Sequence, residues 1–236
     1  MEWLDDLVSE NELRAVRSRR AKSFITEKIS KSQLQHYLDQ NWSIEKEDKK
    51  SYRMKKAKSI DEQFEDLVWV TFADLGFKQM NKDRNFKLRY SSEHSLTQQI
   101  DVFAADDETM ILVECKAATE KIKKGNFKTD IEAIGGKKQG ILKELKKMFP
   151  GKKYKVKFIF ATQNYLLSEQ DLNRMQEFDI AYFDEEVIKY YSDLANHLGQ
   201  SARYQLLGSL FAGQSILGIE NRIPAIEGKM GGHTYY

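Results

Sequence analysis

The chain has 236 residues, and its 38 lysines and arginines against 36 acidic residues leave a formal net charge of only +2. This length fits one medium domain with extensions or two small domains, and 41% hydrophobic and 11% aromatic residues exclude a disordered chain. There is no apolar run of about 18 residues to span a membrane, the acidic start is unlike a signal peptide, and the single cysteine excludes internal disulfides, so we expect a cytoplasmic protein.

The first 58 residues are expected to form a polar, helical extension and a basic connector. Apolar side chains between Leu4 and Val16 form a loose stripe, and Leu34 and Leu38 continue it at helical spacing. Residues 43–58 are poor in apolar side chains and hold seven basic residues. We therefore expect the main domain to begin at residue 59.

A well-defined helix is expected from Ser59 onward. Ser59 is a candidate N-cap with Glu62 as its capping-box partner, apolar residues follow at helical spacing, and Gly76 is a natural C-terminal cap. Three strands are expected next, at residues 86–90, 98–104 and 110–116. The last two form a hairpin.

Helices and strands alternate in the second half of the chain. Ser168 and Asp184 are the expected N-caps of the last two helices. Gly135 and Gly136, in the helix expected at 130–149, each lower helix stability by roughly 1 kcal/mol relative to alanine. The order indicates an α/β fold with a mixed sheet flanked by helices, over residues 59–198, with a C-terminal helix and tail at 199–236. The elements are a helix at 130–149, a strand at 156–161, a helix at 169–177, a strand at 180–183 and a helix at 185–198.

Two carboxylates are expected to face each other across the hairpin. With residues 107–108 as its loop, paired residue numbers sum to 215, so Asp101 lies opposite Glu114 with Cβ atoms about 5 Å apart. Since side chains alternate along a strand, Lys116 shares the face of Glu114 and Cys115 points away. Paired carboxylates are good ligands for a hard divalent cation, and the Cys115 backbone carbonyl is a candidate third ligand.

An ordinary surface salt bridge between Lys116 and a carboxylate is the alternative. Glu-x-Lys occurs four times, but only Glu114 ends an apolar run and has an aspartate opposite it. Charges next to such a run lie near a buried sheet centre, where their burial needs a reason. We therefore interpret the cluster as a Mg²⁺ or Mn²⁺ site that activates water for attack on a phosphate.

These motifs resemble the PD-(D/E)xK, or restriction-endonuclease-like, nuclease superfamily. The family's aspartate matches Asp101 and its (D/E)xK matches Glu114-Cys115-Lys116, whereas the family's proline is replaced by Ile100. The resemblance implies an αβββαβ core, a divalent metal cofactor and cleavage of nucleic-acid phosphodiester bonds. It also implies that Glu65 assists at the site. Glu62 and a merely solvated Glu65 are the alternatives.

Two further stretches carry a resemblance. Phe158–Asn164 and Ile180–Asp184 are similar to the modified-DNA restriction (Mrr-like) branch of that superfamily, in which a strand ends in Thr-Asn before a helix. Ile223–Tyr236 resembles the opening of DGQHR-type domains related to regulators of DNA sulfur modification. This second likeness implies that a further domain follows, and a plain tail is the alternative.

The charge is distributed unevenly along the chain. Thirteen lysines against three acidic residues fall between Lys121 and Lys157, directly after the predicted catalytic strand. Such segregation favours a polyanion-binding face, since each neutralised phosphate releases counterions, while a solvated helix face is the alternative. The candidate DNA contacts are Gln99, Lys121, Lys123, Lys124, Lys128, Lys137, Lys138 and Gln139.

We therefore expect a divalent-metal-dependent DNA endonuclease of a prokaryotic restriction or phage-defence system. Asp101 and Glu114 would bind Mg²⁺ or Mn²⁺, Lys116 would position the attacking hydroxide and Glu65 would assist. The alternative is a non-catalytic DNA-binding module that keeps the fold and senses modified DNA. RNA and single-stranded DNA are further candidate substrates, and cleavage of both strands would need a homodimer or two active sites.

Overall fold

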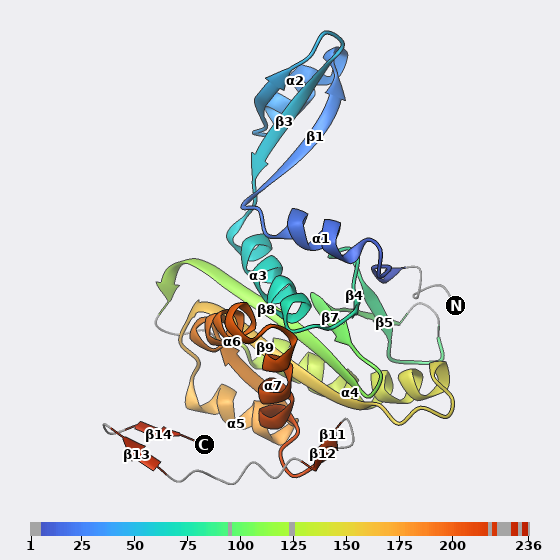
Figure 1. The fold of residues 1–236 in the computed structure, drawn as a ribbon, viewed down its shortest axis with the longest axis vertical. Coiled ribbons are helices and arrows are strands. Elements are labelled where there is room, and N and C mark those ends of the chain that lie inside the picture. Colours follow the sequence, from blue (N-terminus) through green and yellow to red (C-terminus); the bar gives the residue numbers. More distant parts are fainter. Residues whose placement is uncertain are drawn as a thin grey trace.

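A five-stranded mixed sheet lies at the centre of the protein, with helices on both of its faces (Figure 1). The computed structural model describes residues 6–93, 96–122, 126–216, 219–220, 228–230 and 233–235, and for residues 121–122 and those from 215 onward it describes the backbone alone. In spatial order the strands are β10 (Ile180–Asp184), β9 (Lys155–Tyr165), β8 (Thr109–Ile122), β7 (Val102–Ala105) and β4 (Gln79–Met80). β8, β9 and β10 are parallel, whereas β7 and β4 are antiparallel to their neighbours. The expected α/β class with a mixed sheet is confirmed.

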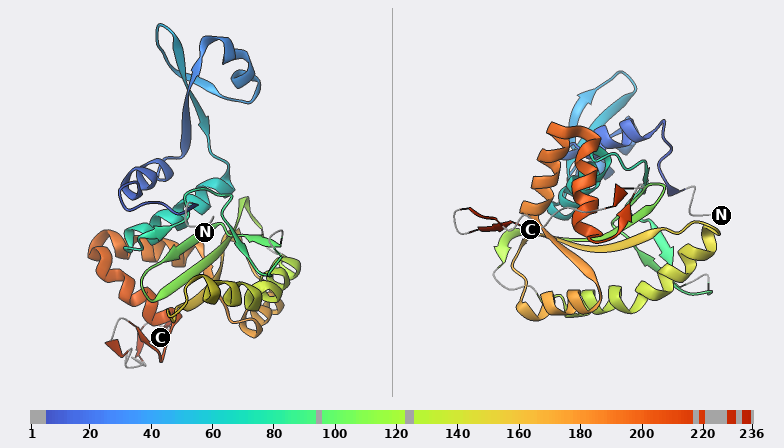
Figure 2. Two further views of the ribbon diagram at one scale, coloured as in Figure 1. Left: turned by 90° about the vertical axis from the view of Figure 1, so that its right-hand side faces the viewer. Right: turned by 60° about the horizontal axis from the view of Figure 1, so that its bottom comes forward.

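Apolar side chains on both faces of the sheet explain why helices cover both. One core cluster joins the strands to the helices on one side, and a second joins them to the helices on the other. Figure 2 shows the two layers on opposite sides of the sheet. The first layer contains α3 (Ile60–Asp74), α6 (Glu185–Leu198), η3 (Gly199–Ser201) and α7 (Ala202–Leu210), with α1 (Leu13–Arg20) against α3; the second contains α4 (Lys128–Met148) and α5 (Glu169–Glu177).

The predicted helix caps are confirmed. Glu62 N donates to Ser59 Oγ at 3.2 Å and Ser59 N to Glu62 Oε2 at 2.8 Å, which completes the capping box of α3. Gly76 follows α3 with φ +93°, a conformation that glycine adopts without strain. Ser168 and Asp184 cap α5 and α6 as expected.

The hairpin of β7 and β8 has the predicted register. Ala104 pairs with Ile111 and Val102 with Val113, so paired numbers sum to 215 and residues 107–108 form the loop. The expected strand 98–104 is nevertheless wrong in one respect, because it is divided at Ile100 and Asp101. The buried side chain of Asn81 causes this break: it donates to Asp101 O at 3.0 Å and accepts from Phe103 N at 3.0 Å, which takes these groups out of the sheet ladder.

The expected strand 86–90 does not join the central sheet. It forms β5 (Lys87–Arg89), which pairs with β6 (Thr97–Gln99) in a separate two-stranded sheet. The edge position next to β7 belongs instead to the short strand β4. Short edge strands limit pairing with other chains, and the two-residue β4 is too short to recognise by its residue pattern.

The helical prediction for residues 1–58 is wrong over most of its described part. Phe24–Ala57 form a three-stranded antiparallel sheet in the order β1-β3-β2, with one short helix, and stand away from the body in Figures 1 and 2. We call this unit the arm. Met54 is fully buried in it, and its neighbour Arg53, which points to the opposite face of the strand, is exposed. Its elements are β1 (Phe24–Ser30), η2 (Lys31–Gln33), α2 (Leu34–Asp39), β2 (Ser43–Glu47) and β3 (Ser51–Ala57).

The C-terminal segment is described in short pieces of backbone. Two hairpins pair there, β11 (Ser215–Ile216) with β12 (Ile219–Glu220), and β13 (Gly228–Met230) with β14 (His233–Tyr235). The rest of the stretch that resembles a DGQHR-type domain, residues 223–227, 231–232 and 236, lies outside the described residues. Among the described helices, none is both long and apolar enough to cross a membrane.

Glycines of α4 give a stability test with a matched control. A Cβ at Gly140 would lie 2.0 Å from the carbonyl oxygen of Tyr90, whereas a Cβ at Gly136 would meet nothing within 4 Å. We expect Gly136→Ala to raise the free energy of unfolding by about 0.8–1 kcal/mol through helix propensity alone. We expect Gly140→Ala to lower it by about 1–3 kcal/mol, because the backbone at Tyr90, directly after β5, must shift.

Urea denaturation followed by circular dichroism measures both changes. Equal effects of the two substitutions would show that the close approach of α4 to Tyr90 is wrong.

Candidate active site

The carboxylate of Asp101 is held at the start of β7. Its Oδ2 accepts a hydrogen bond from Cys115 N at 2.8 Å, and its residue is only 8% exposed. This bond crosses the hairpin at the position that the register predicts. Since Asn81 also binds the carbonyl of Asp101, both the backbone and the side chain of this residue are held.

Glu114 and Lys116 lie on the same face of β8, two residues apart. Lys116 Nζ is 3.0 Å from Glu114 Oε1 and 3.1 Å from Asp130 Oδ1. Asp130 belongs to the first turn of α4, so the lysine bridges the sheet and the helix that covers this face. Cys115 is buried and packs into the opposite core, as its predicted orientation requires.

The third carboxylate comes from α3. Glu65 Oε2 is 2.9 Å from Arg84 Nε, and the same guanidinium binds Asp66 Oδ2 through Nη2 at 2.6 Å. The negative charge of Glu65 contributes to the pKa of Asp101, after burial, so these two groups lie within electrostatic reach. Glu62 is occupied in the capping box. Of the two glutamates considered, the structure therefore brings Glu65 to the site.

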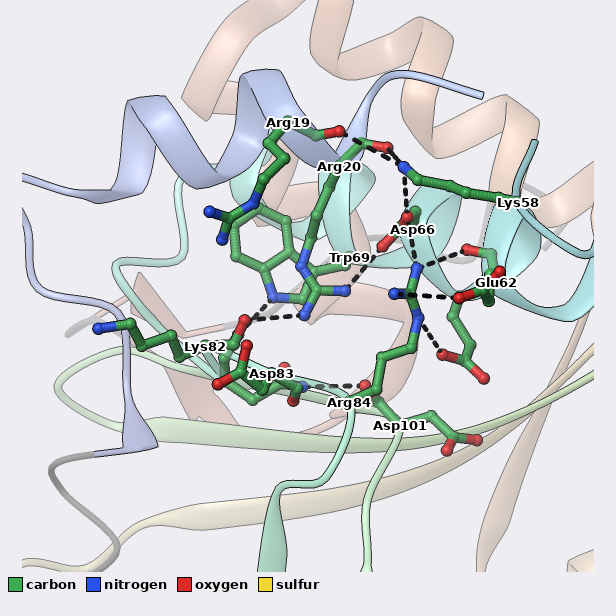
Figure 3. A network of polar contacts seen from close by, with 12 residues as sticks. Arg19, Arg20, Lys58, Glu62, Asp66, Trp69, Lys82, Asp83, Arg84 and Asp101 are labelled. Carbon is green, nitrogen blue, oxygen red and sulfur yellow. Dashed lines mark hydrogen bonds and ion pairs between the residues drawn. The ribbon is translucent and has the colours of Figure 1, made fainter. Parts of the chain in front are cut away.

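Arg84 is one partner of a buried ionic network around Asp66 (Figure 3). Asp66 receives Arg20 Nη1 at 2.7 Å, Lys58 Nζ at 2.8 Å and Arg84 Nη2 at 2.6 Å. Arg20 also lies over the ring of Trp69, with its guanidinium carbon 4.9 Å from the ring centre. The network thus joins α1, the root of the arm and α3 beside the candidate site.

The pKa values in the cluster reflect burial of like charges. Burial and then the charge of Glu65 raise the pKa of Asp101 to about 6, although Cys115 N opposes the shift. Burial and then Asp101 raise the pKa of Glu114 to about 7. Burial also raises the pKa of Glu65, and Arg84 offsets this only partly. Burial alone would lower the pKa of Lys116, but Glu114 and Asp130 outweigh it and raise that pKa.

A divalent cation fits this donor set by its chemistry. Asp101, Glu114 and Glu65 present hard oxygen ligands, and a nearby cation favours the ionised form of each carboxylate against the burial that opposes it. Within the part of the chain that the structure describes, no three His, Cys, Asp or Glu side chains already form a metal-ligand group. The Cys115 carbonyl stays a predicted ligand.

The candidate DNA contacts separate into different environments. Lys138 is an exception to the expectation, because it is buried and its Nζ binds Phe178 O, Asp179 O and Asp179 Oδ2, each within 2.9 Å. Lys137 is half-buried and donates to Gln98 Oε1 at 2.6 Å. Gln99, Lys128 and Gln139 are exposed; the side chain of Lys121, and all of Lys123 and Lys124, lie outside the described residues.

The lysine-rich tract does not form one face beside the site. The 21 residues of α4 rise about 30 Å, and only its first turn reaches Lys116. At the other end of the tract, Lys155 pairs with Thr109, where β8 begins. The lysines from Lys143 to Lys155 therefore lie far from Glu114, whereas Lys157 is opposite Ile111, three residues before Glu114.

Three residues beside the candidate site were missed by sequence reasoning. Arg84 lies in a polar loop and Asn81 next to a two-residue strand, so neither carries a periodic signal. Asp130 had a weak signal, as an acid in the first turn of a helix, but that position has an ordinary explanation in the helix dipole. Only the tertiary contacts assign these residues to the site.

Comparison with known proteins leaves the family open. No protein-family model and no curated protein matches the chain. Among solved structures it is similar to the crystal structure of protein VC1899 from Vibrio cholerae, with 13% sequence identity and a TM-score of 0.39. That match covers 82% of this chain and 52% of the Vibrio chain, so this chain spans about half the length of the protein it matches. A likeness this distant identifies neither a family nor an activity.

The raised pKa values predict how metal-free stability depends on pH. Between about pH 4.5 and pH 7 the folded protein binds more protons at Glu114 than the unfolded chain does, so this group's contribution to stability falls as pH rises through that window. We expect Glu114→Gln to reduce the loss of unfolding free energy between pH 5 and pH 8 by on the order of 1–3 kcal/mol.

Denaturation in EDTA at the two pH values measures this difference. Glu177→Gln is the control, since it removes an exposed carboxylate at the end of α5. If Glu114→Gln shows the same change in unfolding free energy between pH 5 and pH 8 as wild type, the raised pKa of Glu114 is wrong.

Proposed function

We propose that the chain is a divalent-metal-dependent nuclease of the PD-(D/E)xK type that hydrolyses DNA phosphodiester bonds. The observation that carries the proposal is the hairpin register, whose last pair, Val102 and Val113, brings the adjacent Asp101 within electrostatic reach of Glu114, with Lys116 Nζ 3.0 Å from Glu114 Oε1. Burial raises the pKa values of Asp101 and Glu114, so their ionised forms lower the stability of the folded protein. Such shifted pKa values are concentrated at functional sites. A surface salt bridge would not need this burial.

Each side chain has a role that its surroundings allow. Asp101, Glu114 and the Cys115 carbonyl would hold Mg²⁺ or Mn²⁺, which when bound lowers the pKa of water and neutralises charge developing on the phosphate. Lys116, charged at all physiological pH values because of its raised pKa, would orient the attacking water and stabilise the phosphate oxygens. Glu65 would hold a water on the side of α3. Arg84 and Asp130 would position Glu65 and Lys116.

The sheet order also supports the superfamily assignment. β4, β7 and β8 are neighbours in the central sheet, whereas β5 and β6, between β4 and β7 in the chain, form a separate sheet. Without those two strands, the elements α3, β4, β7, β8, α4 and β9 follow the order αβββαβ. The Mrr-like stretches correspond to β9 and β10, where Thr162 Oγ1 lies 3.0 Å from Tyr182 Oη and Asn164 donates to Ala118 O at 2.7 Å. These contacts give both residues structural roles. A place in prokaryotic restriction or phage defence belongs to the same proposal.

A non-catalytic DNA-binding module is the second candidate, and one observation favours it. The acidic side chains of the site already have cationic partners within the protein, with Glu114 paired to Lys116 and Glu65 paired to Arg84. A carboxylate cluster neutralised in this way can persist without a metal. Catalysis would then require that these pairs rearrange when a cation binds.

Cleavage of supercoiled plasmid in Mg²⁺ or Mn²⁺ tests the nuclease. We expect Lys116→Ala to lower the nicking rate by about 100-fold or more, since removing one preorganised donor to a developing charge costs that much in other enzymes. Lys189→Ala on α6, where Lys189 pairs only with Glu185 among the described residues, is the control and is expected to nick at the wild-type rate. Equal nicking by wild type and Lys116→Ala would refute the assignment.

Calorimetric titration with Mn²⁺ at pH 8 separates the two candidates. We expect wild type to bind the cation saturably, and Asp101→Asn with Glu114→Gln to lose this binding because its ligands are removed. Binding should also weaken at pH 5, where both carboxyls are protonated according to pKa values of about 6 and about 7. Absence of cation binding by wild type, together with retained DNA binding, would favour the non-catalytic module.

A further inference from the structure

The arm has one covered and one open face. β1 and β2 are parallel to each other and lie on either side of β3, and the connection between them carries α2. Such a crossover places its helix on a single face of the sheet. Tyr37 of α2 donates to Glu27 at 2.5 Å on the face that also carries the fully buried Met54. No helix of the described residues lies on the other face.

Basic side chains stand opposite one another on the open face. The pairing places Lys28 of β1 opposite Arg53 of β3, and Arg53 opposite Lys46 of β2. All three residues are exposed. In the next row on this face, Lys55 of β3 lies between Thr26 and Ser43. We call these six residues the open face.

Folding of the arm does not account for this row. Like charges directly opposite in a sheet destabilise it. Neither Lys28 nor Arg53 has an ion pair among the described residues, and Lys46 has only Asp48 at 3.5 Å. The charges on the covered face are compensated differently, since Lys31 binds Glu47 there at 2.6 Å. A basic row that costs stability, with no ion pair at Lys28 or Arg53 among the described residues, indicates an anionic partner.

The root of the arm is fixed next to the candidate site. Lys58 directly follows β3, is buried, and binds Asp66 as well as the carbonyl oxygens of Arg19, Arg20 and Lys22. Ser59 then caps α3, on which Glu65 lies six residues later, a rise of about 9 Å. The open-face row at Arg53 lies four residues before the end of β3, about 13 Å from the root. The row and the site therefore fall within about one turn of a DNA duplex, roughly 34 Å.

We propose that the open face binds the phosphate backbone of double-stranded DNA whose neighbouring segment lies at Asp101 and Glu114. The inference rests on the proposed function, since it names a second contact with the same substrate. Lysine, arginine, serine and threonine side chains contact DNA phosphates, and the six residues named above are all of these types. Such contacts position the duplex and read no sequence.

The composition of the open face argues against other polyanions. Single strands are held by stacking of bases on exposed aromatic rings, whereas Phe24, at the root of this face, is half-buried with Lys55 Nζ 3.9 Å from its ring centre. An amphipathic membrane-binding surface combines exposed apolar side chains with the basic ones. The exposed apolar side chains of the arm, Leu38 and Ile44, lie on α2 and on the covered face.

The test compares two variants of equal charge on opposite faces of the arm. The open-face variant is Lys28→Gln with Arg53→Gln, and the matched control is Lys31→Gln with Lys56→Gln on the covered face. Affinity for a 30-base-pair duplex is measured by fluorescence anisotropy in EDTA at several salt concentrations. We expect the open-face variant to bind several-fold more weakly and to lose about 2 from the slope of log K against log salt, and the control to keep the wild-type slope.

Each outcome decides the inference. Equal salt slopes for the two variants would overturn it. Tighter binding of wild type to single-stranded RNA, or to vesicles containing phosphatidylserine, than to the duplex would also overturn it, if the open-face variant lost that binding. Thermal melting shows that the open-face variant is folded, since removal of opposed like charges is expected to leave its melting temperature at or above that of wild type. The anisotropy measurement needs no cleavage, so it tests the arm separately from the nuclease. If the open-face variant has a reduced salt slope but wild type does not nick plasmid, the nuclease proposal fails and the arm contact stands. Nicking by wild type with an unchanged slope would do the reverse.

Discussion

The buried carboxylate of Asp66 is the interaction on which the arrangement of the protein depends. Three cations from separate parts of the chain, Arg20, Lys58 and Arg84, converge on its two oxygens. Removal of one partner from a buried pair leaves an uncompensated charge and costs about 3–5 kcal/mol, so the network holds these segments together. Through Lys58 it fixes the root of the arm, and through Arg84 it fixes Glu65 beside the candidate site.

Burial of the carboxylates in the candidate site lowers the stability of the folded protein, and the rest of the structure must offset this free energy. Asp101, Glu114 and Glu65 all have pKa values raised by burial. Lys116 offsets part of that cost and is in turn shared with Asp130. A cluster of this kind is poised to accept a cation, because a bound cation would reverse the unfavourable balance of charge. The same balance lets internal cations satisfy the cluster without one, which is why metal binding separates the two candidate functions.

Position along the fold changes the meaning of the basic residues. The tract from Lys121 to Lys157 is continuous in sequence, yet it follows a long helix away from Glu114, and Lys138 within it holds the turn at Asp179. The shorter basic stretch before α3 was expected to be a connector. It instead forms strands that place Lys46, Arg53 and Lys55 on one face, beyond the root that Asp66 holds. Alternation along a strand concentrates charge in a way that a count along the chain does not reveal.

The sequence by itself determined the local parts of this protein: the caps at Ser59, Ser168 and Asp184, and the hairpin register that pairs Val102 with Val113, beside Asp101 and Glu114. These features depend on interactions between residues close together in the chain, including a two-residue loop, so a short stretch of sequence is enough to predict them. Only the tertiary structure decided that Asn81 breaks the strand at Asp101. It alone also decided that Arg84 holds Glu65 and that the basic connector becomes an arm. Each of these results from contacts between residues distant in the chain or from strand pairing around a small buried core, and no period in the sequence records such contacts.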